Sequence, residues 1–190
     1  MLLANNITFK RDNKTILSNL NISISPKKII HLTGKNGAGK TTFLKILTNI
    51  LQPDTGEIYW NGKNIKKNPF NFYRHLTLIM DNQTPNYNLT VNENILFWRK
   101  ICNSSINDSQ INSVLNLLML EKYKDMSVNK LSYGEIKKLE LTRLVIERKK
   151  LWILDEPYIG LDQSSVDIVN ETITNHAQLG GMIIFASHIK

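Results

Sequence analysis

Residues 34–41 of the 190-residue chain read Gly34-Lys35-Asn36-Gly37-Ala38-Gly39-Lys40-Thr41, and they give the strongest indication of its fold. It fits the pattern Gly-x-x-x-x-Gly-Lys-[Ser/Thr] of a phosphate-binding loop, in which backbone N–H groups surround phosphate oxygens. Such a loop needs glycines because a Cβ would collide with the closely approaching phosphates. The pattern predicts that Lys40 reaches the β- and γ-phosphates and that the Thr41 hydroxyl ligates Mg²⁺.

The segments on either side of this loop support the same interpretation. Residues 28–33 predict a buried strand that leads into the loop, and residues 42–47 predict a helix that leads out of it. The phosphates would then lie at a helix N-terminus, where free N–H groups and the helix dipole favour anions. A glycine-rich turn that binds nothing is the alternative, and the agreement of both flanks disfavours it.

The composition is that of an ordinary globular chain, with 42% hydrophobic and 21% charged residues. Its length suits one domain, or one domain with an inserted subdomain. No apolar run reaches the ~18 residues of a membrane-spanning helix, and the first residues lack the pattern of a cleaved leader. Cys102 is the one cysteine, so an intrachain disulfide is excluded and a reducing compartment is expected.

The net charge of +8 has three interpretations. The lysines are scattered, with small clusters at residues 137–138 and 148–150, so a solvated surface is favoured. Proximity to an anionic membrane is the second interpretation, and nucleic-acid binding is the third and least favoured.

Two kinds of strand are expected. Residues 151–154 and 182–186 are apolar runs without alternation, which is typical of parallel strands buried on both faces. The shorter strands show partial alternation or stand between turns, and they cover residues 4–10, 17–25, 57–60 and 76–80.

Two carboxylates follow the first of the buried runs. Asp155 is expected at the carboxyl end of its strand, the edge of an α/β sheet where ligands bind, and is predicted to hold Mg²⁺ through water. Glu156 comes next and is predicted to orient and deprotonate an attacking water. A solvated turn is the ordinary interpretation of two adjacent carboxylates, but the buried strand and the phosphate loop disfavour it here.

Helical patterns occupy the region between these parts. Residues 90–93 fit a capping box, and residues 89–131 are interpreted as a helical insert. Ser132 and Glu135 form a second capping box. One interpretation is simply a well-formed helix start; the other is that the Ser132 hydroxyl and the Gly134 N–H face a phosphate bound by a partner subunit.

Six landmarks in this order resemble the nucleotide-binding subunits of ATP-binding cassette (ABC) transporters, over essentially the whole chain. They are the phosphate loop, the helical insert, a Leu-Ser-Gly-Gly-Gln-like signature at residues 131–135, the pair Asp155–Glu156, a D-loop at residues 160–162, and a histidine at position 188. The resemblance implies an α/β phosphate-loop NTPase core with a mostly parallel sheet, an N-terminal antiparallel β-subdomain and an inserted helical subdomain. It implies one ATP-binding domain over residues 1–190, with its core at 1–88 and 132–190 and the helical subdomain at 89–131.

The resemblance also implies roles in a head-to-tail dimer of two such subunits. Glu156, His188 and Lys40 would be catalytic, and Asp162 would couple the two sites across the interface. ATP held by one subunit would be closed over by Ser132, Gly134 and Glu135 of the other. Mg²⁺ would be held by Thr41 and Asp155. The implied ATP-binding residues are Gly34, Lys35, Asn36, Gly37, Ala38, Gly39, Lys40, Thr41, Thr42 and Arg11.

The chain departs from the family pattern in several places. Arg11 stands where an aromatic residue usually stacks on adenine, although a guanidinium plane can also stack on a base. Asp81 occupies the position of the glutamine that ligates Mg²⁺, and Gln83 lies two residues further on, so either residue is a candidate for that role. Tyr133 replaces the first signature glycine and Glu135 the glutamine.

Within the family, Leu-Trp-Ile-Leu-Asp-Glu-Pro at residues 151–157 is similar to the subgroup that serves haem export in bacterial cytochrome c biogenesis. This similarity implies integral membrane partners of a haem export complex, a second ATP-binding subunit, and a peripheral place on the cytoplasmic face of the inner membrane. Three alternatives stay open: the ATPase of a different ABC transporter, a soluble ABC ATPase that acts on nucleic acid or ribosomes, and a subunit that holds ATP without hydrolysing it. No nucleic-acid partner is expected.

Overall fold

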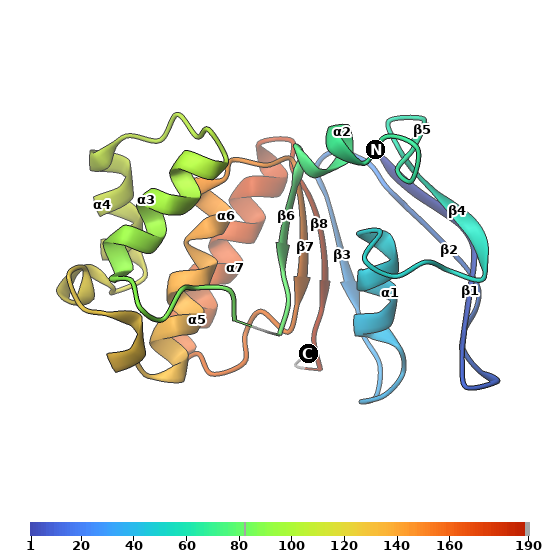
Figure 1. Ribbon diagram of the computed structural model, residues 1–190, viewed down its shortest axis with the longest axis horizontal. Helices are drawn as coiled ribbons and strands as arrows, with labels where there is room; N and C mark the ends of the chain where they lie inside the picture. Colours follow the sequence, from blue (N-terminus) through green and yellow to red (C-terminus); the bar gives the residue numbers. More distant parts are fainter. Residues whose placement is uncertain (82, 189–190) are drawn as a thin grey trace. The chain divides into compact units, whose positions relative to one another are not determined.

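The computed structural model describes residues 1–81 and 83–188 (Figure 1). Contacts divide the chain into two compact units. The first unit comprises residues 1–78, 150–156 and 176–190, and the second comprises residues 79–149 and 157–175. These units are defined by contacts, whereas the expected core and helical subdomain are functional divisions, whose bounds stay a prediction.

An antiparallel sheet of four strands forms one layer of the first unit, in the order β2-β1-β4-β5. The two strands expected over residues 4–10 and 17–25 are confirmed as its hairpin, and both are longer than expected. The strands are β1 (Leu2–Arg11), β2 (Lys14–Ile24), β4 (Thr55–Trp60) and β5 (Lys63–Asn64).

The second sheet has the order β3-β8-β7-β6, and β3, β8 and β7 run parallel. Every residue of β7 and β8 is buried, as their unbroken apolar sequences predict. The expectation that residues 28–33 form a buried strand is wrong in its burial, because β3 is an edge strand with exposed side chains. The strands are β3 (Lys28–Leu32), β6 (Leu76–Ile79), β7 (Leu151–Asp155) and β8 (Met182–Ala186).

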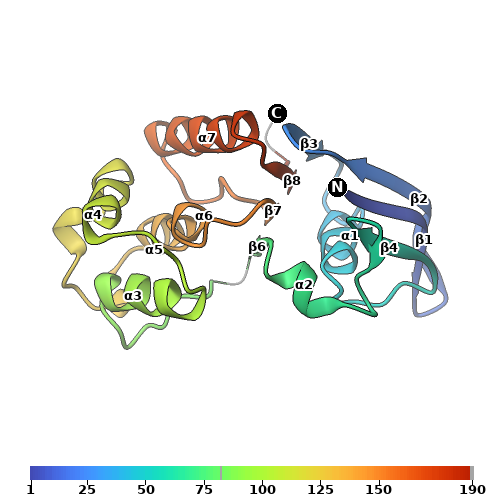
Figure 2. The ribbon, with the colours of Figure 1, turned by 90° about the horizontal axis from the view of Figure 1, so that it is seen from above.

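Helix α1 (Lys40–Leu47) lies between these two sheets in both views (Figures 1 and 2). Its apolar side joins residues of both sheets and the short helix α2 (Pro69–Tyr73) in one hydrophobic core. The phosphate loop precedes α1 directly, so this core holds the helix N-terminus in place. Fully buried members include Leu2, Leu44, Leu47, Ile153 and Ile184.

The second unit is helical and has its own core. Capping boxes begin α3 at Thr90 and α5 at Ser132, which confirms both local predictions, and a further one begins α4 at Asn107. The helices are α3 (Val91–Ile101), α4 (Asp108–Leu117), α5 (Tyr133–Leu141), α6 (Arg143–Ile146) and α7 (Gln163–Gln178), with 3₁₀ turns η1 (Glu121–Tyr123) and η2 (Val128–Lys130). Within the described part of the chain, no helix combines the length and apolar character that crossing a bilayer requires.

Gly56 holds the start of β4 against β1. Its φ is +98°, and a Cβ there would lie 2.5 Å from the backbone oxygen of Asn5. We therefore expect Gly56→Ala to lower the free energy of unfolding by about 2–4 kcal/mol, through backbone strain and overpacking.

Gly62 provides the matched control for this substitution. Its φ is also positive, at +77°, but no atom lies within 4 Å of the Cβ position. Gly62→Ala is expected to cost only the backbone term of about 1 kcal/mol. Urea denaturation of both variants measures the difference, and equal losses would show that the packing against β1 is unimportant.

Candidate functional site

Three neighbouring parallel strands of the first unit end at the same level. In the register of the sheet, Leu32 at the end of β3 pairs with Ala186 at the end of β8, which pairs with Asp155 at the end of β7. The phosphate loop follows β3, Glu156 follows β7, and His188 follows β8 by two residues. The sheet thus brings the phosphate loop to the same edge as Glu156 and His188, although more than a hundred residues separate them in sequence. This is the edge of an α/β sheet at which ligands bind.

The phosphate loop is an exposed turn whose glycines adopt backbone angles that disfavour other residues. Gly37 has a φ of +80° and Gly39 a φ of +90°. Gly39 is also the N-cap of α1, and a Cβ there would lie 3.0 Å from Leu17 and 3.1 Å from Ile16. The glycines therefore serve the loop's own conformation and its packing on β2, besides leaving room for phosphate.

Lys40 points its ammonium group back into this loop. Its Nζ donates to the carbonyl oxygens of Gly34, at 2.7 Å, and Lys35, at 3.3 Å. The loop thus places a positive charge at the N-terminus of α1, where the helix dipole already favours anions. Thr41 beside it is exposed and Thr42 is half-buried.

Arg11 lies at the end of β1 and is exposed. Its guanidinium carbon lies 5.9 Å from the centroid of the Phe9 ring. The sequence did not single out Phe9, although it stands two residues from the position where the family pattern has an aromatic side chain. The role of Arg11 beside adenine stays a prediction.

Glu156 sits in a strained backbone conformation. Its φ is +47°, in the left-handed region that costs a residue with a side chain roughly 1–3 kcal/mol. The Glu156 N–H donates to the Ala186 oxygen at 2.9 Å, which holds this geometry. Asp155 before it is 1% exposed, whereas the Glu156 side chain retains 15% exposure. The turn therefore gives two adjacent carboxylates opposite surroundings, one buried and one reaching the surface.

Glu156 and His188 are in direct contact. The His188 Nδ1 lies 2.9 Å from Glu156 Oε2, and the His188 backbone N–H donates to the same oxygen at 3.4 Å. A carboxylate oxygen accepts, so Nδ1 carries the proton of this hydrogen bond and Nε2 is left for another partner. The sequence predicted both residues as catalytic but not that one would orient the other.

The residues at this edge resemble a Mg²⁺ site that water and phosphate complete more than a metal site built entirely of protein ligands. Among residues 1–81 and 83–188, no three His, Cys, Asp or Glu side chains are grouped to hold a metal ion. Mg²⁺ is usually bound by one or two carboxylates together with waters and substrate phosphates. Asp155 ends β7 and Thr41 lies in the first turn of α1, so the segments at this edge carry one carboxylate and one hydroxyl, the donor types that this mode of binding uses.

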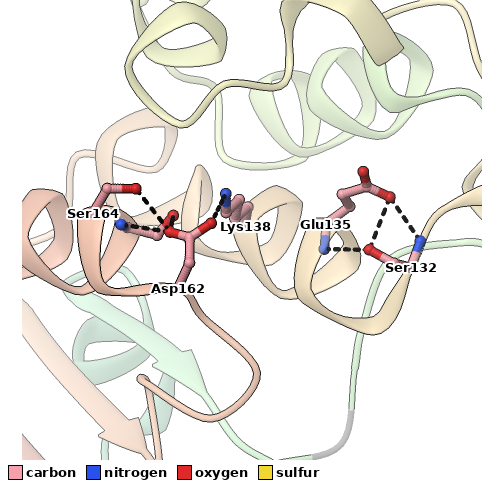
Figure 3. A network of polar contacts seen from close by, with 6 residues as sticks. Ser132, Glu135, Lys138, Asp162 and Ser164 are labelled. Carbon is pink, nitrogen blue, oxygen red and sulfur yellow. Dashed lines mark hydrogen bonds and ion pairs between the residues drawn. The ribbon is translucent and has the colours of Figure 1, made fainter.

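The predicted signature residues lie in the second unit, at the start of α5 (Figure 3). Glu135 Oε2 accepts from the Ser132 N–H at 2.8 Å and from the Ser132 hydroxyl at 2.9 Å. Burial alone would raise the pKa of Glu135, but hydrogen bonds from Tyr123 and Ser132 and the nearby Lys122 outweigh it and lower that pKa. Glu135 is therefore a carboxylate engaged with its own helix start.

Tyr133 and Gly134 pack against the predicted D-loop. A Cβ at position 134 would lie 2.5 Å from the Gly160 oxygen, and one at position 160 would lie 2.6 Å from the Tyr133 ring. Both glycines are thus needed for the close approach of these two segments. The Tyr133 ring covers Gly160 and is itself about half exposed.

Asp162 is held within its own chain at the start of α7 (Figure 3). Its Oδ1 accepts from the Ser165 N–H at 2.8 Å, the Ser165 hydroxyl at 2.5 Å and the Ser164 hydroxyl at 2.9 Å. Its Oδ2 accepts from Lys138 Nζ on α5 at 3.3 Å. These bonds, those of Ser165 first, hold the pKa of Asp162 well below its usual range. The sequence did not indicate the contact with Lys138.

The two candidates for the missing glutamine differ in their surroundings. Asp81 is exposed, whereas Gln83 is bonded at both ends of its amide. Gln83 Oε1 accepts from the Tyr87 hydroxyl at 2.6 Å, and its Nε2 lies 3.5 Å from the Tyr133 oxygen.

Glu140, a buried carboxylate two turns along α5, was not foreseen from the sequence. It accepts from the Thr84 hydroxyl at 2.9 Å and is fully buried. Burial raises its pKa, and this effect outweighs the stabilisation of its charge by Thr84, Lys137 and Arg143.

Comparison with known proteins places the sequence among ABC proteins. The family model described as "ABC transporter" matches residues 17–159. The chain is 34% identical over 188 residues to the cytochrome c biogenesis ATP-binding export protein CcmA of Vibrio vulnificus, covering 99% of this chain and 92% of that protein. It is 32% identical to the protein of the same name from Escherichia coli K12, covering 99% of this chain and 89% of that protein.

Solved structures agree on the fold. An ATP-binding subunit of an ABC transporter superposes with a TM-score of 0.88 at 21% identity, covering 100% of this chain and 80% of that one. An ABC transporter ATP-binding protein from Pyrococcus furiosus superposes with a TM-score of 0.86 at 23% identity, covering 100% of this chain and 92% of that one. The predicted fold, a phosphate-loop α/β core with an antiparallel β-sheet and added helices, is confirmed.

Proposed function

This chain belongs to the ABC transporter family of ATP-binding subunits, and from that premise we propose that it hydrolyses ATP for an export complex that serves cytochrome c biogenesis. One observation carries the proposal: the phosphate loop, Glu156 and His188 follow three adjacent parallel strands that end in register, and Asp155 is the last residue of β7, directly before Glu156. The similarity to the CcmA proteins over nearly the whole chain supports the choice of system.

In this proposal each residue at the strand ends has a distinct role in ATP hydrolysis. The phosphate-loop N–H groups and Lys40 bind the phosphates, and Thr41 and Asp155 hold Mg²⁺, which neutralises phosphate charge when bound. Glu156 accepts a proton from the attacking water, and the hydrogen bond from His188 fixes the direction of its carboxylate. Because Glu156 is held by both its backbone and His188, it needs little reorganisation during the reaction.

A second copy of the chain completes the site in this proposal. Ser132 and Gly134 at the N-terminus of α5 offer a hydroxyl and an N–H to the phosphate held by the partner. The close packing of Gly134 on Gly160 would make the signature and the D-loop move together. ATP binding would then close the dimer and hydrolysis would open it.

The partners proposed are integral membrane subunits of a haem export complex, with this chain attached to the cytoplasmic face of the inner membrane. A direct test is affinity purification of the tagged chain from mildly solubilised native membranes, with the tag alone as control. We expect small multi-span chains to co-purify together with a haem absorption band. A different membrane partner without haem would contradict the haem export assignment and leave the ATPase proposal standing.

A further inference from the structure

A segment of the first unit concentrates positive charge. Residues 58–78 contain three lysines and one arginine and no aspartate or glutamate, so they carry half of the chain's net charge of +8. Within the described residues, none of these four side chains forms an ion pair with a carboxylate. All four are exposed: Lys63, Lys66, Lys67 and Arg74.

The same segment displays an aromatic ring. Phe70 on α2 is 83% exposed, although the helix that carries it is firmly packed. Phe72 on that helix is 1% exposed and meets the Trp60 ring edge-on, with 6.0 Å between ring centroids. The Tyr73 hydroxyl donates to the Thr48 oxygen at 3.1 Å. Phe70 is therefore held outward by a fixed helix, not exposed by a loose loop.

Two of the lysines lie in the short segment that joins β5 to α2, and local bonds to Asn64 fold this segment. The Lys67 N–H donates to the Asn64 oxygen at 3.2 Å, and the Lys66 N–H donates to the Asn64 side chain at 2.9 Å. β5 and α2 lie at one end of the first unit, and the carboxyl ends of β7 and β8 lie at the other (Figure 1). The exposed charges and the ring thus lie within one segment, residues 63–74, at the end of the first unit away from the carboxyl ends of β7 and β8.

We propose that residues 63–74 bind directly to a membrane surface rich in acidic phospholipids. The lysines and Arg74 neutralise headgroup phosphates, and Phe70 enters the interfacial layer, as in other basic surfaces with an exposed aromatic side chain. Lysines suit a diffuse layer of headgroups, whereas a nucleic-acid platform uses several stacking rings in a groove. This contact is additional to attachment through protein partners and does not depend on ATP hydrolysis.

The proposal is tested with the purified full chain and sedimenting vesicles of phosphatidylcholine, with or without phosphatidylglycerol. Each lysine near an anionic surface contributes about fivefold to the partition coefficient. We therefore expect the triple variant K63A/K66A/K67A to bind acidic vesicles at least about tenfold more weakly, since such effects are not fully additive. Phe70→Ser is expected to weaken binding about tenfold with little change in its salt dependence.

A matched triple variant distinguishes the effect of residues 63–74 on vesicle binding from the effect of the chain's net charge. K10A/K14A/K28A removes three exposed lysines of the same unit and the same total charge, and its binding is expected to change less than about threefold. Equal losses in the two triple variants, or no binding of the unaltered chain to acidic vesicles, would overturn the proposal. Binding of single-stranded RNA that depends on residues 63–74, without vesicle binding, would also overturn it. Turnover of ATP by the same samples reports separately on the proposed function.

Discussion

Replacement of Lys40 by alanine is expected to lower the rate of ATP turnover by about 10²–10³-fold, because it removes a fixed positive charge from the phosphates. A hydrogen bond to a charged group contributes about 1.5–3 kcal/mol, so the affinity for ATP should also fall by about 10- to 100-fold. The contacts of Lys40 with Gly34 and Lys35 show that the ammonium already lies within the loop. The loss of turnover and of ATP affinity is therefore expected to come from the missing positive charge and not from a displacement of helix α1.

The measurement is thermal unfolding with and without MgATP. A ligand at a hundred times its dissociation constant stabilises a chain of this size by roughly 5–10 °C, and the same MgATP concentration should give about half of this shift or less in Lys40→Ala. Lys45→Ala is the matched control, since Lys45 lies on the same helix five residues further on. An equal shift in Lys40→Ala and the unaltered chain would show that the loop does not bind the phosphates through Lys40.

Local motifs were the most predictable part of this molecule. The capping boxes at Thr90 and Ser132 rest on contacts over three residues, and both are present. A third box, Asn107 with Gln110, was missed although its pattern is equally local. The phosphate loop was recognisable for the same reason, because all its determinants stand within eight residues.

Burial depends on strand order, which the sequence states only indirectly. Residues 151–154 and 182–186 were correctly assigned to buried strands because their apolar runs leave no polar face. Residues 28–33 read Lys-Ile-Ile-His-Leu-Thr and form an edge strand. Their polar Lys28, His31 and Thr33 distinguish them from the two entirely apolar runs, and the prediction of a buried strand overlooked this local sign.

Contacts across the fold were unpredictable from the sequence. The Trp152 and His176 rings stack at 3.6 Å, and Gly181 makes this possible, since a Cβ there would lie 2.2 Å from the His176 ring. Burial lowers the pKa of His176 in this position. The left-handed backbone of Glu156 is another such feature, because the Ala186 oxygen on a neighbouring strand holds it.

Glu156→Gln should produce the largest effect on chemistry, with turnover lowered by about 10²–10⁴-fold while ATP still binds. The amide keeps an oxygen that can accept the hydrogen bond from His188, so the local geometry is expected to persist. Without a base to deprotonate water, ATP should remain intact between the two subunits of the proposed dimer. Glu171→Gln is the matched control, because it makes the same chemical change at an exposed position on α7.

Light scattering of Glu156→Gln in the presence and absence of MgATP measures whether ATP joins two copies of the chain. We expect a particle of one chain, 21.9 kDa, without nucleotide and a particle of about twice that mass with MgATP. The unaltered chain should return to the smaller particle as it hydrolyses its ATP. If Glu156→Gln stays at the mass of one chain and turns over ATP at the normal rate, Glu156 is not the base and ATP does not join two chains.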